Sequence, residues 1–272
     1  MGSSKHPSSL MSSVLRSFKV LEAVARMQPV TLGTLMKSFD LSKSTLQRTL
    51  TTLEAAGWIQ QVSSESRAWE ITSHALLVRP RLLEGDTLYA RSRLPMVQLR
   101  DVTDETVHLS IFHPPSSMVL VDRVDSHQMV RAMGTIGEPA LMHATSLGKA
   151  VLAYLPDPAV DLVLAGQLKQ STPNTIVDPD ELLEELRLVR ECGYAVNRSE
   201  GRRAVCAIAS PIFDAKGEPV AGICISMPDS RFAEDRVAEW GSLVRAAAET
   251  ISLHRVNEPV HSITVAAHPS GA

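Results

Sequence analysis

In this chain of 272 residues, residues 31–59 predict a pair of short helices, with the sequence TLGTLMKSFDLSKSTLQRTLTTLEAAGWI. Thr31 predicts the N-cap of a first helix that ends near Phe39, because a threonine oxygen accepts a hydrogen bond from an N–H group of the first turn. Ser42 predicts the N-cap of a second helix, and Gly57 stands where a helix end favours a left-handed residue. The spacing therefore predicts a helix-turn-helix.

The predicted second helix has an apolar and a polar side. Leu46, Leu50 and Leu53 recur at i, i+4 and i+7, which is the spacing of a buried stripe. The opposite side carries amide and guanidinium groups that can read base edges in the major groove of DNA, and hydroxyl and ammonium groups that can contact phosphates. An amphipathic surface helix is the alternative for this segment alone. The predicted DNA contacts are base reading by Gln47 and Arg48, and backbone contacts by Thr31, Ser42, Lys43, Ser44 and Thr45.

A hairpin and a further helix complete this region. Residues 58–62 and 67–71 read as two short strands joined by a polar loop, and a hairpin after a helix-turn-helix makes a winged helix. Arg67, at the root of the hairpin, is placed to touch phosphates. Before the helix-turn-helix, Ser12 or Ser13 caps a predicted helix. Its expected buried stripe is Val14, Phe18, Leu21 and Ala25.

Charge is divided unevenly along the chain. Residues 1–80 contain nine Lys or Arg and five Asp or Glu, a balance of +4; the remainder contains 18 and 25, a balance of −7, which gives the net charge of −3. No acidic residue lies between Asp40 and Glu54, where Lys43 and Arg48 occur. The second predicted helix is thus locally positive. A nonspecific polyanion binder would be basic throughout, so that class is excluded.

Three predicted segments follow the winged helix of residues 1–74. Residues 75–95 predict a linker helix that Pro80 interrupts or begins, and Pro95 ends this helix or starts the next one, since proline is tolerated only in a first turn. Residues 96–256 alternate strand and helix patterns, including two hairpins and a last helix over residues 230–254, which predicts an α+β domain on a largely antiparallel sheet. Residues 257–272 predict a disordered tail.

Three cysteines without a CxxC spacing favour neither a disulfide framework nor a zinc site. A reducing cytoplasm is expected, and no segment has the roughly 20 apolar residues of a membrane span. Residues 147–150, LGKA, lack the other residues of a phosphate-binding loop, and His108, His113 and His143 match no common metal-ligand spacing. We therefore expect no catalytic residues, no metal and no cofactor.

Four stretches resemble the IclR family of bacterial transcriptional regulators. They are residues 41–58, LSKSTLQRTLTTLEAAGW; 142–156, MHATSLGKAVLAYLP; 182–196, LLEELRLVRECGYAV; and 200–228, EGRRAVCAIASPIFDAKGEPVAGICISMP. The resemblance implies a winged helix, a linker helix and a GAF-like effector-binding domain. It further implies a dimer or tetramer that binds operator DNA and changes its affinity when a small molecule binds. The alternative is a small-molecule sensor whose helical N-terminus makes protein contacts.

A pocket can also be argued from the last hairpin. A turn centred between Ala215 and Lys216 would place Ala207 opposite Cys224, on a face of small side chains that either leaves a cavity or lets a helix pack closely. The resemblance favours the cavity. The effector-binding residues that it implies are Met129, Ala132 or Met133, Ala140, Ser146, Leu147, Asn197, Val205, Ala207, Cys224 and Ser226.

The resemblance also bears on the effector. Family members that bind small oxoacids favour Asp, Cys and Ser where this chain has Asn197, Ala207 and Cys224. A larger, partly apolar organic acid or aromatic metabolite is therefore expected. The N–H groups that open the helix at Ser146 are a further expected contact for a carboxylate.

Overall fold

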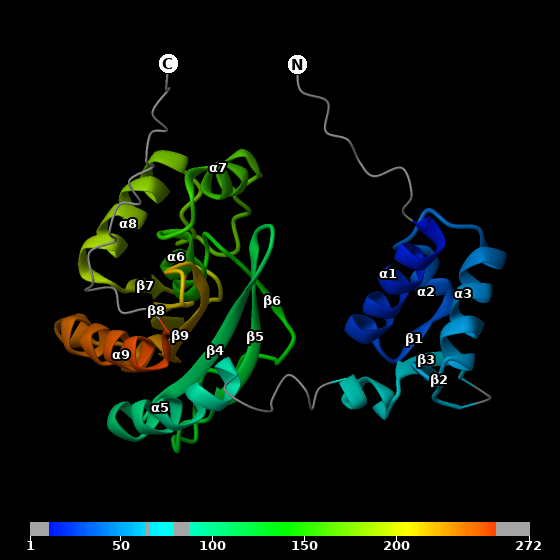
Figure 1. Ribbon diagram of the computed structural model, residues 1–272, viewed down its shortest axis with the longest axis horizontal. Coiled ribbons are helices and arrows are strands. Elements are labelled where there is room, and N and C mark those ends of the chain that lie inside the picture. Colours follow the sequence, from blue (N-terminus) through cyan, green and yellow to red (C-terminus); the bar gives the residue numbers. More distant parts are fainter. Residues whose placement is uncertain (1–10, 64–65, 79–86, 254–272) are drawn as a thin grey trace, which may run out of the picture. The chain divides into compact units, whose positions relative to one another are not determined.

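The computed structural model describes residues 11–63, 66–78 and 87–253. The chain divides into two compact units, with the boundary between Gly85 and Asp86 (Figure 1). The tip of the predicted wing loop, residues 79–86 of the predicted linker helix and the predicted tail lie outside the described residues.

The first unit is a three-helix winged helix followed by a 3-10 turn. Its small antiparallel sheet has the order β1-β3-β2, in which the unpredicted β1 pairs Val30 with Trp69 of β3. Its elements are α1 Ser12–Met27, β1 Val30–Thr31, α2 Leu32–Met36, α3 Lys43–Ala55, β2 Ile59–Gln61, β3 Ala68–Ile71 and the 3-10 helix Ser73–Val78.

The predicted helix-turn-helix is confirmed. The hydroxyl oxygens of Thr31 and Ser42 accept hydrogen bonds from backbone N–H groups in the first turns of α2 and α3. Gly57 is left-handed at φ 80° just beyond α3. Helix α2 is shorter than predicted, because Lys37, its C-cap, turns its backbone N–H onto the carbonyls of Thr34 and Leu35.

Only Leu21 of the predicted stripe of α1 packs against the core, so the stripe is wrong in its other three residues. Val20, Ala23 and Val24 are the buried residues, whereas Val14 and Phe18 are 43% and 56% exposed. Apolar residues occur around most of this helix, so a 3.6-residue spacing fits more than one face. The core against α3 and β3 decides which face is buried.

The second unit is built on a six-stranded antiparallel sheet with the order β6-β5-β4-β9-β8-β7, which confirms the α+β class. Its helices are α5 Leu88–Thr103, α6 Ser146–Leu152, α7 Asp157–Ala165, α8 Pro179–Cys192 and α9 Val237–Ile251, with 3-10 turns at Asp229–Arg231 and Glu234–Arg236. Its strands are β4 Thr106–His113, β5 Ser117–Val124, β6 Pro139–Leu141, β7 Ala195–Arg198, β8 Val205–Phe213 and β9 Pro219–Pro228.

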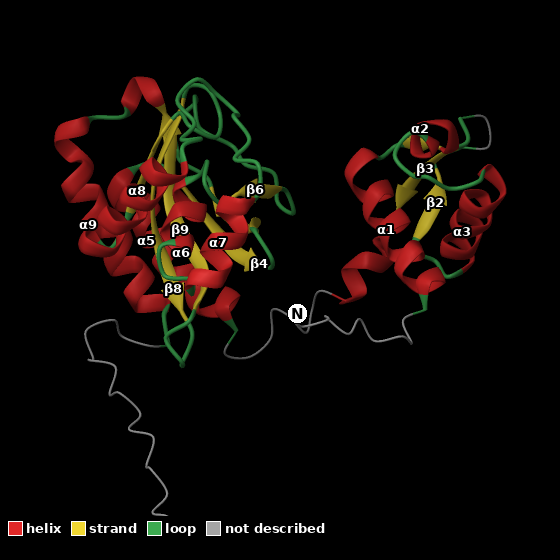
Figure 2. Cartoon of the chain, turned by 90° about the horizontal axis from the view of Figure 1, so that it is seen from above, coloured by secondary structure: helices red, strands yellow, loops and turns green. Residues whose placement is uncertain are grey.

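Helices cover both faces of this sheet (Figure 2). On one face, Leu109, Ile223 and Ile225 pack with Trp240 and Val244 of α9, in a core that α5 also joins. Alternate strand residues point the other way, where they meet α6, α7 and α8. The second face carries smaller side chains beside α6, and it is the face that holds the cavity described below.

Two predicted boundaries in the second unit are wrong. Pro95, expected to end one helix or to start the next, lies inside α5 and is buried. The last helix begins at Val237, because residues 229–236 form two 3-10 turns, which lack the hydrogen-bond pattern of an α-helix.

The predicted register of the last hairpin is wrong by two residues. Ala207 pairs with Ser226, and Ala209 pairs with Cys224. The ladder has an irregularity at Phe213, next to the turn. The predicted pairing was counted symmetrically from the turn and so did not include this irregularity. A shift of two residues keeps every side chain on its predicted face, so the face assignment is still correct.

Candidate functional sites

A groove on the first unit brings together four of the predicted DNA-contacting residues. Lys43 and Gln47 lie one helical turn apart on α3, and with Thr31 and Arg67 they line a concavity of about 810 Å³ between α2, α3 and the wing. Arg67 adopts a left-handed conformation at φ 46° and is exposed. With Gln61 of β2, the chain thus presents two cations and two amides around one groove.

The first turn of α3 is fixed by its own hydroxyl groups. Ser42 Oγ lies 2.9 Å from Thr45 Oγ1 and 3.1 Å from Ser44 Oγ, and accepts the Thr45 N–H at 3.2 Å. Thr45 is half-buried, whereas Ser42 and Ser44 are exposed. A hydroxyl group has a single hydrogen to donate, and the two contacts between oxygens use two of the three, so one hydroxyl hydrogen of this group remains for a phosphate oxygen.

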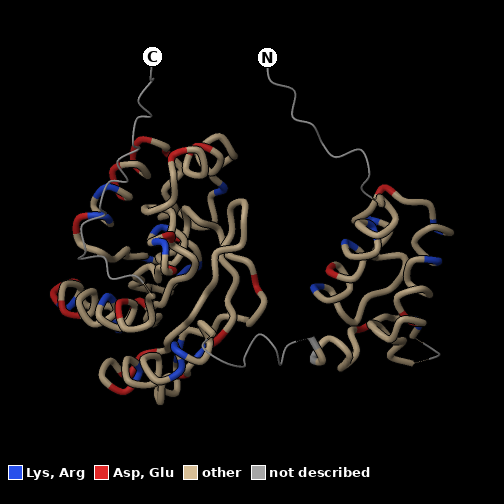
Figure 3. Tube along the Cα trace, viewed as in Figure 1, with Lys and Arg blue, Asp and Glu red and all other residues tan. Residues whose placement is uncertain are grey.

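Arg48 is exposed on α3 but is not among the residues that line this groove. Arg48 follows Gln47 directly, so the two side chains lie on adjacent sides of one helix. Arg48 presents the paired N–H donors of its guanidinium group there, and Gln47 presents its amide. In the second unit, by contrast, acidic and basic residues are mixed along α8 and α9 (Figure 3). The stretch around Lys43 contains no acidic residue, so it is locally positive and favours the binding of a polyanion.

The second unit contains a cavity of about 290 Å³ between the sheet and α6. Its sheet side is formed by β4, β5, β8 and β9, and its other sides by α6 and the segments around residues 132–141 and 197–202. The predicted effector residues that line it are Ala132, Met133, Ala140, Ser146, Leu147, Asn197, Val205, Ala207, Cys224 and Ser226.

Met129 is the one predicted effector residue that the structure does not bring to the cavity. Its side chain is 96% exposed. The loop before β6 turns inward only from Ala132, which is buried, so the position that the family resemblance assigned to Met129 lies outside the cavity.

The close approach of α6 to the preceding segment depends on Gly148. An added Cβ there would collide with the backbone carbonyl of Met142. The Thr145 hydroxyl caps α6 by accepting the Gly148 N–H at 3.1 Å and donates to the Leu141 carbonyl at 2.9 Å. This geometry holds Ser146 and Leu147 at the cavity wall.

Behind α6 lies a buried ionic cluster that sequence patterns did not reveal. Lys149 Nζ lies 2.8 Å from Glu185 on α8 and 2.9 Å from Glu200, and the lysine side chain is 1% exposed. Burial raises the pKa of Glu200, and the neighbouring Lys149 ammonium opposes that rise. The cluster ties α6, α8 and the β7–β8 connection together.

The same cluster fixes the connection that carries two cavity residues. The backbone N–H of Glu200 donates to Asn197 Oδ1 at 3.1 Å, and Asn197 Nδ2 donates to the Ala144 carbonyl at 2.7 Å. The Thr175 hydroxyl donates to the Glu200 carbonyl at 2.6 Å. Asn197 therefore serves as a structural anchor for the turn that leads to Arg202.

His108 lines the cavity from β4 and is only 9% exposed. Burial, aided by the positive charge of Arg123, lowers the pKa of His108 from 6.5 to about 4, so its imidazole is neutral at pH 7. Its Nε2 has no hydrogen-bond partner among the described residues. A neutral imidazole can accept or donate one hydrogen bond at that atom, depending on its tautomer.

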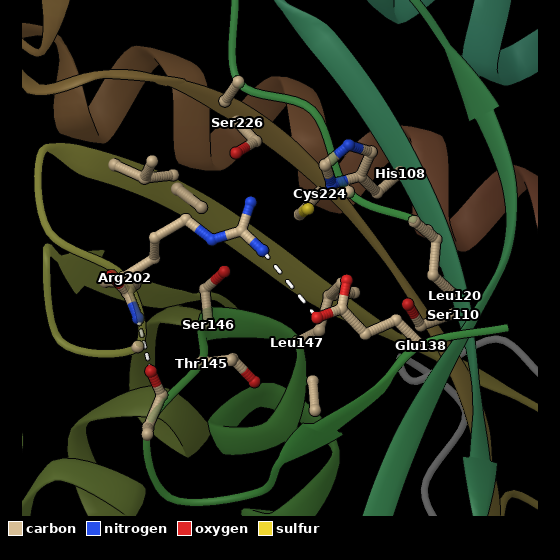
Figure 4. Close-up of a pocket in the computed structure, with 18 of the residues that line it drawn as sticks. His108, Ser110, Leu120, Glu138, Thr145, Ser146, Leu147, Arg202, Cys224 and Ser226 are labelled. Atoms are coloured by element: carbon tan, nitrogen blue, oxygen red, sulfur yellow. Dashed lines mark hydrogen bonds and ion pairs between the residues drawn. The ribbon is translucent and has the colours of Figure 1, made fainter. Parts of the chain in front are cut away.

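Arg202 and Glu138 face one another across the cavity (Figure 4). Arg202 Nη1 donates to the Met133 carbonyl at 2.9 Å, and Nη2 lies 3.8 Å from Glu138 Oε1. In Figure 4, His108, Cys224 and Ser226 lie on the sheet side of this pair.

Neither His108 nor Arg202 was predicted to line the cavity. The signal for His108 was present, because it alternates with Val107 and Leu109 on a predicted strand and shares a face with Ser110. Arg202 lies on an irregular turn, where no periodicity shows which way a side chain points.

Within residues 11–63, 66–78 and 87–253, no group of three or more His, Cys, Asp or Glu side chains is arranged to hold a metal ion. No described helix is long and apolar enough to cross a membrane.

Two family profiles match this chain. The profile of the bacterial transcriptional regulator IclR C-terminal domain matches residues 81–253, and that of the IclR helix-turn-helix domain matches residues 13–63. Among curated proteins, the HTH-type transcriptional regulator KdgR of Escherichia coli is 33% identical over 91% of this chain and 94% of its own length. The transcriptional repressor IclR of Escherichia coli is 33% identical over 89% of each chain.

Solved structures share the fold. A putative IclR transcriptional regulator from Silicibacter sp. is similar with a TM-score of 0.79 at 27% identity, over 89% of this chain and 95% of the other. An IclR homologue from Microbacterium hydrocarbonoxydans, solved in complex with 4-hydroxybenzoate, is similar with a TM-score of 0.74 at 20% identity, over 89% and 98%. The profiles and relatives span both units, and the chain belongs to the IclR family of bacterial transcriptional regulators.

Proposed function

We propose that this protein is a sequence-specific DNA-binding transcriptional regulator whose affinity for its operator is modulated by a small molecule in the cavity of the second unit. The observation that carries the proposal is the acid-free face of α3 beside the wing, where Lys43, Gln47 and Arg67 share one groove and Arg48 is exposed next to Gln47. Its relatives are regulators and repressors by name, which supports repression as the mode of action.

Within this proposal, Gln47 and Arg48 read base edges, while Thr31, Lys43, Ser44 and Arg67 hold phosphates. Amide and guanidinium groups make paired hydrogen bonds to purine edges, whereas single ammonium and hydroxyl groups fix the protein on the backbone. Ser42 and Thr45 hold the first turn of α3 through their mutual hydrogen bonds, and the one hydroxyl hydrogen left over among Ser42, Ser44 and Thr45 donates to phosphate.

The effector is an organic acid or an aromatic catabolic metabolite. The cavity mixes apolar walls, such as Leu120 and Leu147, with the hydroxyls of Ser110, Ser146 and Ser226. A homologue of the same fold was solved with 4-hydroxybenzoate, which is a compact aromatic acid. Ligand sites of this kind are apolar clefts with a few polar groups that set orientation.

Further parts of the proposal follow from DNA binding. The protein acts as a homodimer or tetramer, because one recognition helix contacts too few base pairs to select an operator. It works in the cytoplasm, where bacterial DNA lies, and it has no catalytic role, in keeping with relatives that are regulators.

A second candidate function is a small-molecule sensor whose N-terminus makes protein contacts. The observation that favours it is an exposed apolar stripe on α1, formed by Met11, Val14, Leu15 and Phe18. Such a stripe suits a protein partner, although it is equally compatible with pairing of two DNA-binding units.

The two candidates are separated by selecting bound duplexes from a randomised DNA library with the full-length protein. A regulator enriches one motif, and an oligomeric regulator enriches it as a repeat of two half-sites. A protein-contact module enriches no motif, which would refute the main proposal.

A further inference from the structure

One ion pair at the cavity of the second unit has no role in the function proposed above. It joins Arg202 and Glu138. The two side chains are 57% and 49% exposed, and their closest approach, 3.8 Å, is longer than the roughly 3.2 Å limit of a good N–H···O hydrogen bond. Exposed ion pairs of this kind contribute little to stability. The pair therefore gives way easily to a better partner of either charge.

Arg202 and Glu138 are the only charged side chains among the described residues that line the cavity, because His108 is neutral at pH 7. A guanidinium fork matches a carboxylate with two parallel hydrogen bonds, which one 3.8 Å contact does not achieve. Arg202 Nη1 is already oriented by its bond to the Met133 carbonyl at 2.9 Å. One cation is thus held at the cavity with its anion loosely attached.

We propose, resting on the effector function above, that the ligand is a small carboxylate which displaces Glu138 from Arg202. In the ligand-free protein Glu138 occupies the place of the ligand's carboxylate. Binding replaces an internal contact with a contact to the ligand. Since Glu138 precedes β6 and Arg202 precedes β8, the exchange removes one of two contacts between these segments and leaves the hydrogen bond from Arg202 to Met133, and this is a change that a ligand can transmit.

The rest of the ligand must be neutral and able to form a hydrogen bond. His108 is buried at the cavity with Nε2 unpartnered among the described residues, and a hydroxyl or carbonyl group on the ligand would pair with it. The cavity of about 290 Å³ lies near the lower end of small-molecule sites, so the acid is compact.

The test measures binding by calorimetry to the full-length protein with matched pairs of probes: 4-hydroxybenzoate, salicylate, lactate and mandelate, each against its primary amide. Arg202→Met should weaken the binding of an acid by about tenfold or more, since a charge-assisted pair is lost. Glu138→Gln should tighten it by about threefold or more, because the competitor loses its charge. Arg203→Met, which removes the same charge from an exposed neighbour outside the lining, should leave binding unchanged.

The proposal is overturned if amides bind as tightly as their acids, if Arg202→Met binds like the unmodified protein, or if none of the acids binds either the unmodified protein or Glu138→Gln. Thermal melts without ligand confirm that each variant is folded. Binding of each variant to the library-selected duplex is measured in parallel. Selective DNA binding without any acid response rejects the carboxylate exchange alone, whereas loss of selective DNA binding by the unmodified protein rejects the proposed function itself.

Discussion

Lys149 Nζ lies 2.9 Å from the carboxylate of Glu200, and both side chains are almost fully buried, at 1% and 7% exposed. An ion pair in such a place must compensate the loss of water around both charges, so it stabilises only while both partners are present. Its structural role is to hold the turn that carries Asn197 and Arg202 against α6.

Lys149→Met should therefore destabilise the second unit by about 3–5 kcal/mol, because it leaves the buried Glu200 carboxylate without its cation. Differential scanning calorimetry of the full-length protein measures the change. Lys216→Met, at an exposed lysine in the last hairpin, is the matched control and should change the free energy of unfolding by less than about 0.5 kcal/mol. Equal melting of the two variants would show that the buried cluster contributes no more than a surface charge.

Acid should weaken the fold through His108. Its pKa falls from 6.5 to about 4 in the folded protein, so the folded state resists protonation that the unfolded chain accepts. The resulting stability is fully present above pH 6.5 and is lost as the pH falls toward 4. Between pH 7 and pH 5 this loss amounts to about 2 kcal/mol.

His108→Gln should remove that part of the pH dependence, measured by urea unfolding at pH 7 and pH 5. The charged groups nearest the ring, Arg123, Asp125 and Arg202, remain in the variant, so their own effects cancel in the comparison. His113→Gln, at the exposed end of the same strand, should keep the full dependence. An unchanged slope in His108→Gln would contradict the assignment.

Ala207→Phe should fill the cavity and abolish the response to ligand, while operator affinity without ligand stays the same. Ala207 is a small, buried side chain on the sheet side of the cavity, and a ligand can shift DNA affinity only through its own site. The measurement is DNA affinity with and without the bound acid, beside a thermal melt. Ala215→Phe, in the exposed hairpin turn, is the control. A folded Ala207→Phe protein that still responds would place the ligand elsewhere.

At least two copies should occupy each operator, on half-sites about one helical turn or a multiple of it apart. Light scattering on the free protein and on its complex with the selected duplex measures the mass directly. Monomers in both samples would contradict this expectation.

The sequence predicted those parts of the fold in which chemistry is local. Thr31, Ser42 and Gly57 mark helix ends by side-chain hydrogen bonds or backbone conformation, and Leu46 and Leu50 show one unambiguous buried face. Such signals depend on residues a few positions apart, so they survive without knowledge of the tertiary structure.

The predictions that were wrong depend on contacts between residues far apart in the sequence. The buried face of α1 is selected by α3 and β3 and not by its own spacing, and the irregularity at Phe213 shifted the register of the last hairpin. Met129 and Arg202 lie on irregular segments, where no period assigns a direction to a side chain. Lys43 and Gln47 of the candidate DNA groove, by contrast, follow from helical spacing on α3.

The most direct test of DNA reading compares Arg48→Ala with Lys43→Ala in gel-shift titrations on the selected operator and on a scrambled duplex. Arg48→Ala should weaken operator binding by about 1–3 kcal/mol and leave the scrambled duplex nearly unaffected, because it removes a contact to base edges. Lys43→Ala should weaken both duplexes alike, because it removes a phosphate contact. Undiminished operator binding by Arg48→Ala, or an equal loss on both duplexes, would contradict the assignment of α3 as the helix that reads the operator through Arg48.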